Sequence, residues 1–95
     1  MALLDKVKVA CEISVNDQGI NGELTDLIAA AKQELIVAGI IVPENEDNIP
    51  ELVAQAIKLY CRMNFRSPAN FEQLRTAYDR TVGLLRNADD YIEEA

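Results

Sequence analysis

The stretch from Glu51 to Phe65, ELVAQAIKLYCRMNF, decides the fold of this chain. Its apolar residues recur at helical spacing, and they cover a wider arc than a helix needs in order to pack on a single neighbour. We therefore expect a central helix that is contacted from two sides. The residues of this broad face are Leu52, Val53, Ala56, Ile57, Tyr60 and Cys61.

Start signals precede this helix and the one that follows it. Asn48 and Glu51 stand at the spacing of a capping box, and Pro50 suits a first helical turn because its missing amide would have no partner there. We therefore predict that the central helix begins at Asn48. In the same way, Ser67 followed by Pro68 predicts an N-cap and the start of the next helix.

Three flanking helices complete the pattern. The clearest of them has Asn21 as its predicted N-cap, after a turn over residues 16–19, and ends at Gly39, which supplies a left-handed residue. The apolar stripes of the three helices are Leu4, Val7 and Cys11; Leu24, Leu27, Ile28, Ala31 and Leu35; and Phe71, Leu74, Tyr78, Thr81 or Val82, and Leu85.

These patterns predict an all-α fold, a small bundle of about four helices. Three of the helices form the core, and the short N-terminal helix lies across them. A chain of 95 residues fits one domain, which we place over residues 1–86. Residues 87–95, NADDYIEEA, lose the periodicity and are expected to form an acidic C-terminal tail or a short acidic helix. Gly83, inside the last helix, indicates either a weak turn or a closely packed neighbour.

The net charge of −7 is divided unevenly along the chain. Residues 1–51 carry three lysines against ten acidic residues, residues 52–86 carry six basic residues against two acidic ones, and residues 87–95 carry four acidic residues. Charge segregated in this way suits contact between unlike faces, within the fold or between copies. Solvated helix faces that simply differ in charge are the alternative, and an acidic chain is a poor candidate for wrapping nucleic acid.

The sequence offers little for catalysis. It contains no histidine, its glycines form no phosphate loop, and Cys11 and Cys61 have no metal-binding spacing, so we predict no enzyme, no cofactor and no metal site. Both cysteines fall on apolar faces and are expected to be buried, reduced thiols. The alternative of a cation held at residues 16–19 or at the acidic run 44–47 competes with plain solvated turns.

The segment between the second and third helices, GIIVPENEDNIP (39–50), joins an apolar half to an acidic half. The apolar half, Ile40-Ile41-Val42, either folds back over the helix ends, as residues after a terminating glycine do, or is covered by a neighbouring subunit. The acidic half is the candidate surface for a neighbour's arginines.

In their order, the helical segments resemble the small head–tail connector proteins of tailed bacteriophages, also described as DNA-packaging or head-completion proteins. The resemblance covers residues 3–86 and rests on GELTDLIAAAKQELIVAGI (22–40), IPELVAQAIKLYCRMNF (49–65) and FEQLRTAYDRTVGLL (71–85). It implies a structural virion protein that forms a ring below the portal after packaging, extends the DNA channel and docks the next connector or tail component.

The resemblance also implies partners and a location. The partners would be further copies in a homo-oligomeric ring, the portal protein and another connector or tail protein, with DNA passing through without sequence-specific binding. Assembly would take place in the host bacterial cytoplasm, and the final position would be the head–tail junction of the virion. The sequence shows no signal peptide and no membrane span, so we expect no membrane contact.

A ring requires a heterologous interface, in which one face of each copy meets a different face of the next. Charge and exposure select the candidates for it. They are Lys58, Arg62, Arg66, Arg75 and Arg80 on one side, and Glu44, Glu46, Asp47 and the tail acids on the other, together with Ile40 and Ile41.

Two other functions fit the sequence. The broad face of the central helix suits a generic helical interaction module, an adaptor or regulator, that binds a partner helix. The third and fourth helices also suit a helix-turn-helix DNA-binding regulator, with Arg75 and Arg80 toward a DNA groove. Because Phe71 and Leu74 take early recognition-helix positions and the net charge opposes DNA, we rank the regulator last.

Overall fold

The computed structural model describes residues 3–15 and 17–92. Over these residues the chain forms four α-helices and two short 3-10 turns, with no named strand, so the predicted all-α fold is confirmed. The elements are α1 (Leu3–Ala10), α2 (Gln18–Val37), η1 (Glu46–Asn48), α3 (Glu51–Asn64), α4 (Phe71–Asn87) and η2 (Asp89–Tyr91).

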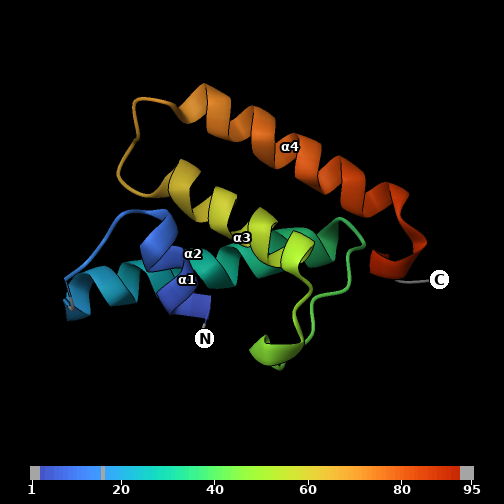
Figure 1. Cartoon of the computed structure of the whole chain (residues 1–95), viewed down its shortest axis with the longest axis horizontal. Coiled ribbons are helices and arrows are strands. Elements are labelled where there is room, and N and C mark those ends of the chain that lie inside the picture. Colours follow the sequence, from blue (N-terminus) through green and yellow to red (C-terminus); the bar gives the residue numbers. More distant parts are fainter. Residues whose placement is uncertain (1–2, 16, 93–95) are drawn as a thin grey trace.

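The helix α3 is the centre of the fold. Figure 1 shows it between α4 on one side and α1 and α2 on the other, and it contacts all three. The principal extents of 41 × 30 × 18 Å describe a slab whose thinnest dimension is less than two helix diameters of about 10 Å each. Half of the residues of α3 are buried, as expected for a helix that is contacted from two sides. Its buried residues are Val53, Ala54, Ala56, Ile57, Leu59, Cys61 and Met63.

The flanking helices bury the stripes that their spacing predicts. Of the two alternatives on α4, the structure selects Thr81, which is 8% exposed and whose Oγ1 donates to the Ala77 carbonyl at 2.9 Å. That bond satisfies a hydroxyl that would otherwise be buried without a partner. The buried residues are Leu3 and Val7 on α1, Leu24, Ile28, Ala31 and Leu35 on α2, and Leu74, Tyr78, Thr81 and Leu85 on α4.

The helix α2 begins one turn earlier than predicted. Its N-cap is Asp17, which is extended at φ −112° and ψ 125° and whose Oδ1 accepts the Ile20 amide at 3.1 Å. The predicted N-cap at Asn21 is wrong, because Asp17 already accepts from an orphan amide of the first turn and leaves Asn21 inside the helix. The second half of the predicted turn 16–19 is therefore helical, and residue 16 lies outside the described residues.

The predicted end of α2 at Gly39 is confirmed. Gly39 has φ +87°, its amide donates to the Ile36 carbonyl at 2.9 Å, and the Ile40 amide donates to the Leu35 carbonyl at 3.0 Å. This pair of bonds is a Schellman motif, which satisfies the last carbonyls of the helix and turns the chain back over it.

The segment after α2 packs against the chain's own C-terminal segment. Ile40 forms an isolated antiparallel bridge with Ile92, and the Ile41 amide donates to the Tyr91 carbonyl at 2.8 Å. Ile40 is 1% exposed and Val42 packs on the core, whereas Ile41 is 45% exposed. Of the two alternatives for this apolar run, folding back within the chain holds for Ile40 and Val42, while Ile41 keeps an outward surface.

The helix α3 begins at Glu51, and the predicted start at Asn48 is wrong. Asn48 closes η1, which is capped by Asn45: its Oδ1 accepts the Asp47 amide at 3.0 Å. A proline disfavours helical conformation in the residue before it, and Ile49, which precedes the proline, is extended at ψ 121°. This extended residue separates η1 from α3, and α3 has no side-chain cap.

The helix α4 begins at Phe71, so the predicted start at Ser67 and Pro68 is also wrong. Arg66 and Ser67 have φ values of +56° and +49°, in the left-handed region. An N-cap residue is typically extended, a conformation that Ser67 does not have. The two left-handed residues instead redirect the chain through a turn over residues 65–70, after which α4 returns alongside α3 in the opposite direction (Figure 1).

Candidate subunit interface

The interface candidates divide between different elements of the fold. The basic ones lie on α3, on the α3–α4 turn and on α4, whereas the acidic ones lie on the projecting loop that contains η1 (Figure 1). Of the tail acids, Asp89 and Asp90 lie on η2, and Glu93 and Glu94 lie outside the described residues. The two groups of opposite charge therefore lie on different parts of the surface, as the two sides of a heterologous contact would.

Three of the basic candidates already form ion pairs within the chain. The carboxylate partners are largely exposed, and exposed pairs of this kind contribute only about 0–1 kcal/mol each. These side chains thus have a local partner but are not tightly held. The pairs are Lys58 Nζ with Glu51 Oε1 at 3.7 Å, Arg66 Nη2 with Glu23 Oε2 at 3.3 Å, and Arg75 Nε with Asp79 Oδ2 at 3.9 Å.

Glu46 anchors the η1 loop to the helices. Its Oε1 accepts the Leu3 amide of α1 and its Oε2 accepts from Lys32 Nζ of α2, each at 3.1 Å. The Leu3 amide, followed by the Lys32 ammonium, lowers the pKa of the Glu46 carboxyl below its ordinary value. Both carboxylate oxygens are thus used inside the chain.

Among the basic candidates and those of the η1 loop, four have side chains without a hydrogen bond or ion pair in the described part of the chain: Glu44, Asp47, Arg62 and Arg80. Glu44, Asp47 and Arg80 are exposed, and Arg62 is half-buried. These four remain the charged groups that a neighbouring chain could pair with.

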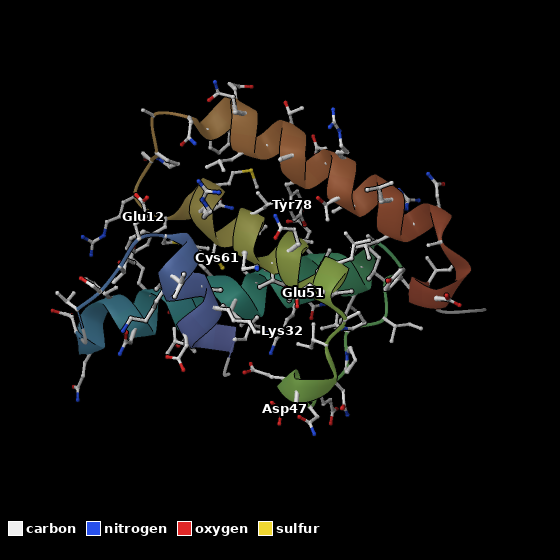
Figure 2. The ribbon with its side chains drawn as sticks, in the orientation of Figure 1. Glu12, Lys32, Asp47, Glu51, Cys61 and Tyr78 are labelled. Atoms are coloured by element: carbon white, nitrogen blue, oxygen red, sulfur yellow. The ribbon has the colours of Figure 1, made fainter. Side chains whose placement is uncertain are left out.

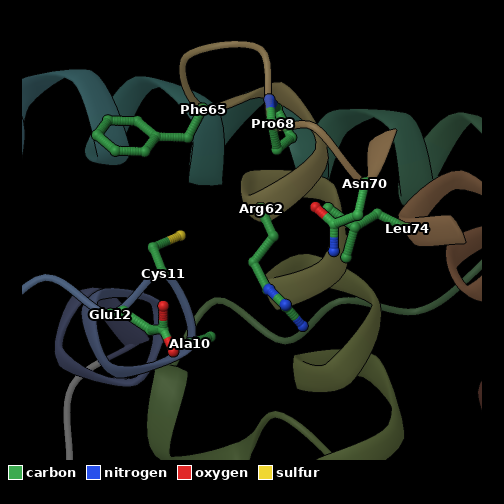
Figure 3. A pocket seen from close by; sticks show the side chains of 8 residues that line it. All are labelled: Ala10, Cys11, Glu12, Arg62, Phe65, Pro68, Asn70 and Leu74. Carbon is green, nitrogen blue, oxygen red and sulfur yellow. The ribbon is translucent and has the colours of Figure 1, made fainter. Parts of the chain in front are cut away.

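Arg62 points into a cavity of about 170 Å³ between the end of α1 and the α3–α4 turn (Figure 3). Burial raises the pKa of the Cys11 thiol on the wall of this cavity, and the positive charge of Arg62 offsets part of that rise. The lining residues are Ala10, Cys11, Glu12, Arg62, Phe65, Pro68, Asn70 and Leu74.

The C-terminal end of α2 exposes an apolar patch, which we define as Ile36, Val37 and Ile41. Their exposed fractions are 47%, 77% and 45%. Ile36 and Ile41, with Ile40 and Val42, line a cavity of about 350 Å³. Because Ile40 is buried in the chain's own core, Ile41 is the member of the predicted pair that a neighbour can reach.

The described residues contain no group of three or more His, Cys, Asp or Glu side chains arranged to hold a metal ion. Within the same residues, no helix combines the length and the apolar character needed to cross a membrane. Both cysteines are free, and Cys61 is fully buried, which raises the pKa of its thiol to about 12.

Residues 3–91 match the family model described as phage connector protein. The chain belongs to the phage connector protein family. The match includes all four helices, so the resemblance found in the sequence is confirmed. The family is structural rather than enzymatic and implies a position at the head–tail junction of the virion. Comparison with curated proteins and with solved structures found no match.

Sequence reasoning missed two features of this phage connector protein. Charge and exposure select Arg62 as a surface charge, but it is half-buried and lines an open cavity with the end of α1 and the α3–α4 turn. The second feature is the apolar patch, of which the sequence predicted only Ile41. Ile36 and Val37 are adjacent β-branched residues outside the buried stripe of α2, and that position was the sequence feature that indicated their exposure. No local pattern predicts the cavity, because its walls come from the end of α1, from α3, from the α3–α4 turn and from α4.

Proposed function

We propose that this phage connector protein assembles as a homo-oligomeric ring below the portal after genome packaging, extends the DNA channel and docks the next connector or tail component. Assembly takes place in the host cytoplasm. The observation that carries the proposal is the family match over residues 3–91, which spans the whole helical fold.

The distribution of charge supports a ring. A heterologous contact needs two unlike faces on each copy. Exposed acids on the η1 loop and unpaired arginines on α3 and α4 provide such faces, and charge complementarity would steer one copy onto the next. The apolar patch of Ile36, Val37 and Ile41 adds surface that an adjoining protein would cover.

The net charge of −7 supports a channel through which DNA slides. A protein that grips DNA neutralises phosphates with Lys and Arg, and this chain has an excess of acids instead. In a helix-turn-helix the two helices meet at about 90–120°. Because α4 runs back alongside α3, the geometry favours the connector over the DNA-binding alternative (Figure 1).

The experiment combines the purified protein with the portal protein of the same phage. Light scattering after size exclusion gives the mass, and negative-stain images give the shape. We expect an additional ring of density on the portal and no salt-dependent shift of duplex DNA. A strict monomer or dimer that leaves the portal unchanged would favour the helical interaction module, and a salt-dependent DNA shift would favour the regulator.

A further inference from the structure

Arg62 is a half-buried cation that forms no ion pair among the described residues. Its side chain leaves α3 and reaches into the cavity between the end of α1 and the α3–α4 turn (Figure 3). Charged side chains that leave water are normally paired, because desolvation of an unpaired charge is costly. Among residues 3–15 and 17–92, Arg62 makes no ion pair or hydrogen bond.

The walls of the cavity suit a carboxylate. Phe65, Leu74 and Ala10 contribute apolar surface, which lowers the local dielectric constant and strengthens attraction to the guanidinium. The planar guanidinium presents parallel N–H groups that match the two oxygens of a carboxylate. Asn70 lines the same cavity and adds an amide donor.

Glu12 is the opposing charge in this cavity. It is exposed and makes no ion pair with Arg62. Its backbone has φ +60°, which only a few per cent of non-glycine residues adopt, and the residue lines the cavity. An incoming carboxylate would therefore be attracted by Arg62 and weakly repelled by Glu12.

Asp47 is the matching anion on another part of the surface. It is exposed on η1, and Figure 2 shows it on the projecting loop, well apart from Glu12 at the cavity rim. Its neighbours hold it in place: Glu46 binds Leu3 and Lys32, and Asn45 Oδ1 accepts the Asp47 amide. A carboxylate on an anchored turn loses less conformational entropy on binding than one on a free loop.

We propose that the Arg62 cavity of one copy binds the Asp47 carboxylate of the next copy. Because the cavity and η1 lie on different parts of the molecule, one chain cannot close this contact by itself, and each copy offers one donor site and one acceptor site. Repetition of such a contact generates a ring when the rotation closes. The inference rests on the ring that we propose as the function and names the contact that builds it.

Charge exchange tests this contact. Arg62→Glu and Asp47→Arg are each expected to raise the protein concentration needed for assembly on the portal by roughly tenfold or more. The double variant carrying both changes restores complementary charges and is expected to assemble at nearly the wild-type concentration. Arg86→Glu, an exposed change of equal charge outside the cavity, is the matched control and should leave assembly unchanged. If Arg62→Glu unfolds the chain, Arg62→Gln replaces it.

The outcomes separate the contact from the function. If the wild type assembles and Arg62→Glu assembles equally well, the contact is wrong while the ring stands. If both single variants fail and the double variant is not restored, the cavity takes a carboxylate from another protein and the proposed contact is overturned. If the wild type does not assemble on the portal, the function fails and the contact with it.

Cys11 gives a second readout without substitution. It lines the cavity and is half-buried, whereas Cys61 is fully buried. Assembly on the portal is expected to slow maleimide labelling of Cys11 by at least about tenfold, because the neighbouring η1 loop covers the cavity. Equal labelling before and after assembly would show that the cavity stays open and would overturn the contact.

Discussion

The Tyr78 hydroxyl of α4 donates a hydrogen bond to Glu34 Oε1 of α2 at 2.9 Å. The two helices lie on either side of α3, so this bond links the outer elements of the fold. The Tyr78 ring is 5% exposed and packs on the Tyr60 ring of α3, with centroids 5.8 Å apart and planes at 59°. Burial, followed by the bond to Glu34, raises the pKa of the Tyr78 hydroxyl well above its usual range.

Replacing Tyr78 by Phe keeps the buried ring and removes this bond. The free energy of unfolding is expected to fall by about 1–2 kcal/mol, because the lost bond has a carboxylate as its acceptor. Tyr60→Phe is the matched control, since the Tyr60 hydroxyl makes no hydrogen bond among the described residues. Urea unfolding at neutral pH measures both variants, and equal losses would contradict the role of the Tyr78–Glu34 bond.

The lowered pKa of the Glu46 carboxyl leads us to expect a loss of folding stability in acid. Its folded pKa lies below the ordinary value of 4.5, so the ionised carboxylate contributes stability above that value and loses it as the pH falls through the folded pKa. Glu46→Gln is expected to cost less than about 1 kcal/mol at pH 7, because the side chain is 38% exposed, and to flatten the decline in acid. Unfolding curves at several pH values measure this, and Glu44→Gln, in the same loop, should change little.

Alanine substitution at two glycines with open surroundings should change the free energy of unfolding in opposite directions. A Cβ would meet nothing within 4 Å at either Gly83 or Gly39, so the close-packing alternative for Gly83 is wrong and backbone conformation decides both cases. Gly83→Ala is expected to raise the free energy of unfolding by about 1 kcal/mol, through helix propensity. Gly39→Ala is expected to lower it by about 1 kcal/mol or more, because φ is +87°. Thermal unfolding compares the two, and shifts of the same sign would contradict this reading.

The two thiols should differ in reactivity. Cys61 is 0% exposed and burial raises its pKa to about 12, whereas Cys11 is half-buried beside Arg62. Titration of the native monomer with a chromogenic disulfide at about pH 8 is expected to modify Cys11 slowly and Cys61 only after unfolding. Single Cys→Ser variants assign the signals. Equal rates for the two thiols in the native protein would contradict the burial of Cys61.

The helices and the core were predictable because each depends on local periodicity. The broad apolar arc of Glu51–Phe65 predicts the central position of α3, and Gly39 predicts the end of α2, since only a left-handed residue continues the chain there. Three helix starts were misplaced by three or four residues. Each start depends on backbone conformation that the local pattern does not contain, such as the extended Ile49 before Pro50 and the left-handed Ser67.

The sequence selects the charged candidates but not which of them already pair within the chain. Charge and exposure select Arg62 and Asp47, but they also select Glu46, whose two carboxylate oxygens hold the loop to α1 and α2. Which charges pair within the chain depends on contacts between segments that are far apart in sequence. The partial burial of Arg62 also depends on contacts between distant segments, because α1, α3 and the α3–α4 turn must all fold before the cavity exists.

We propose that this phage connector protein forms a ring on the portal, and this ring can be imaged. The most direct measurement is cryo-electron microscopy of the portal of the same phage after incubation with the purified protein. We expect a closed ring of copies below the portal, coaxial with its channel, with η1 of each copy against the Arg62 cavity of the next. Portal particles without added density, alongside protein that remains monomeric, would contradict it.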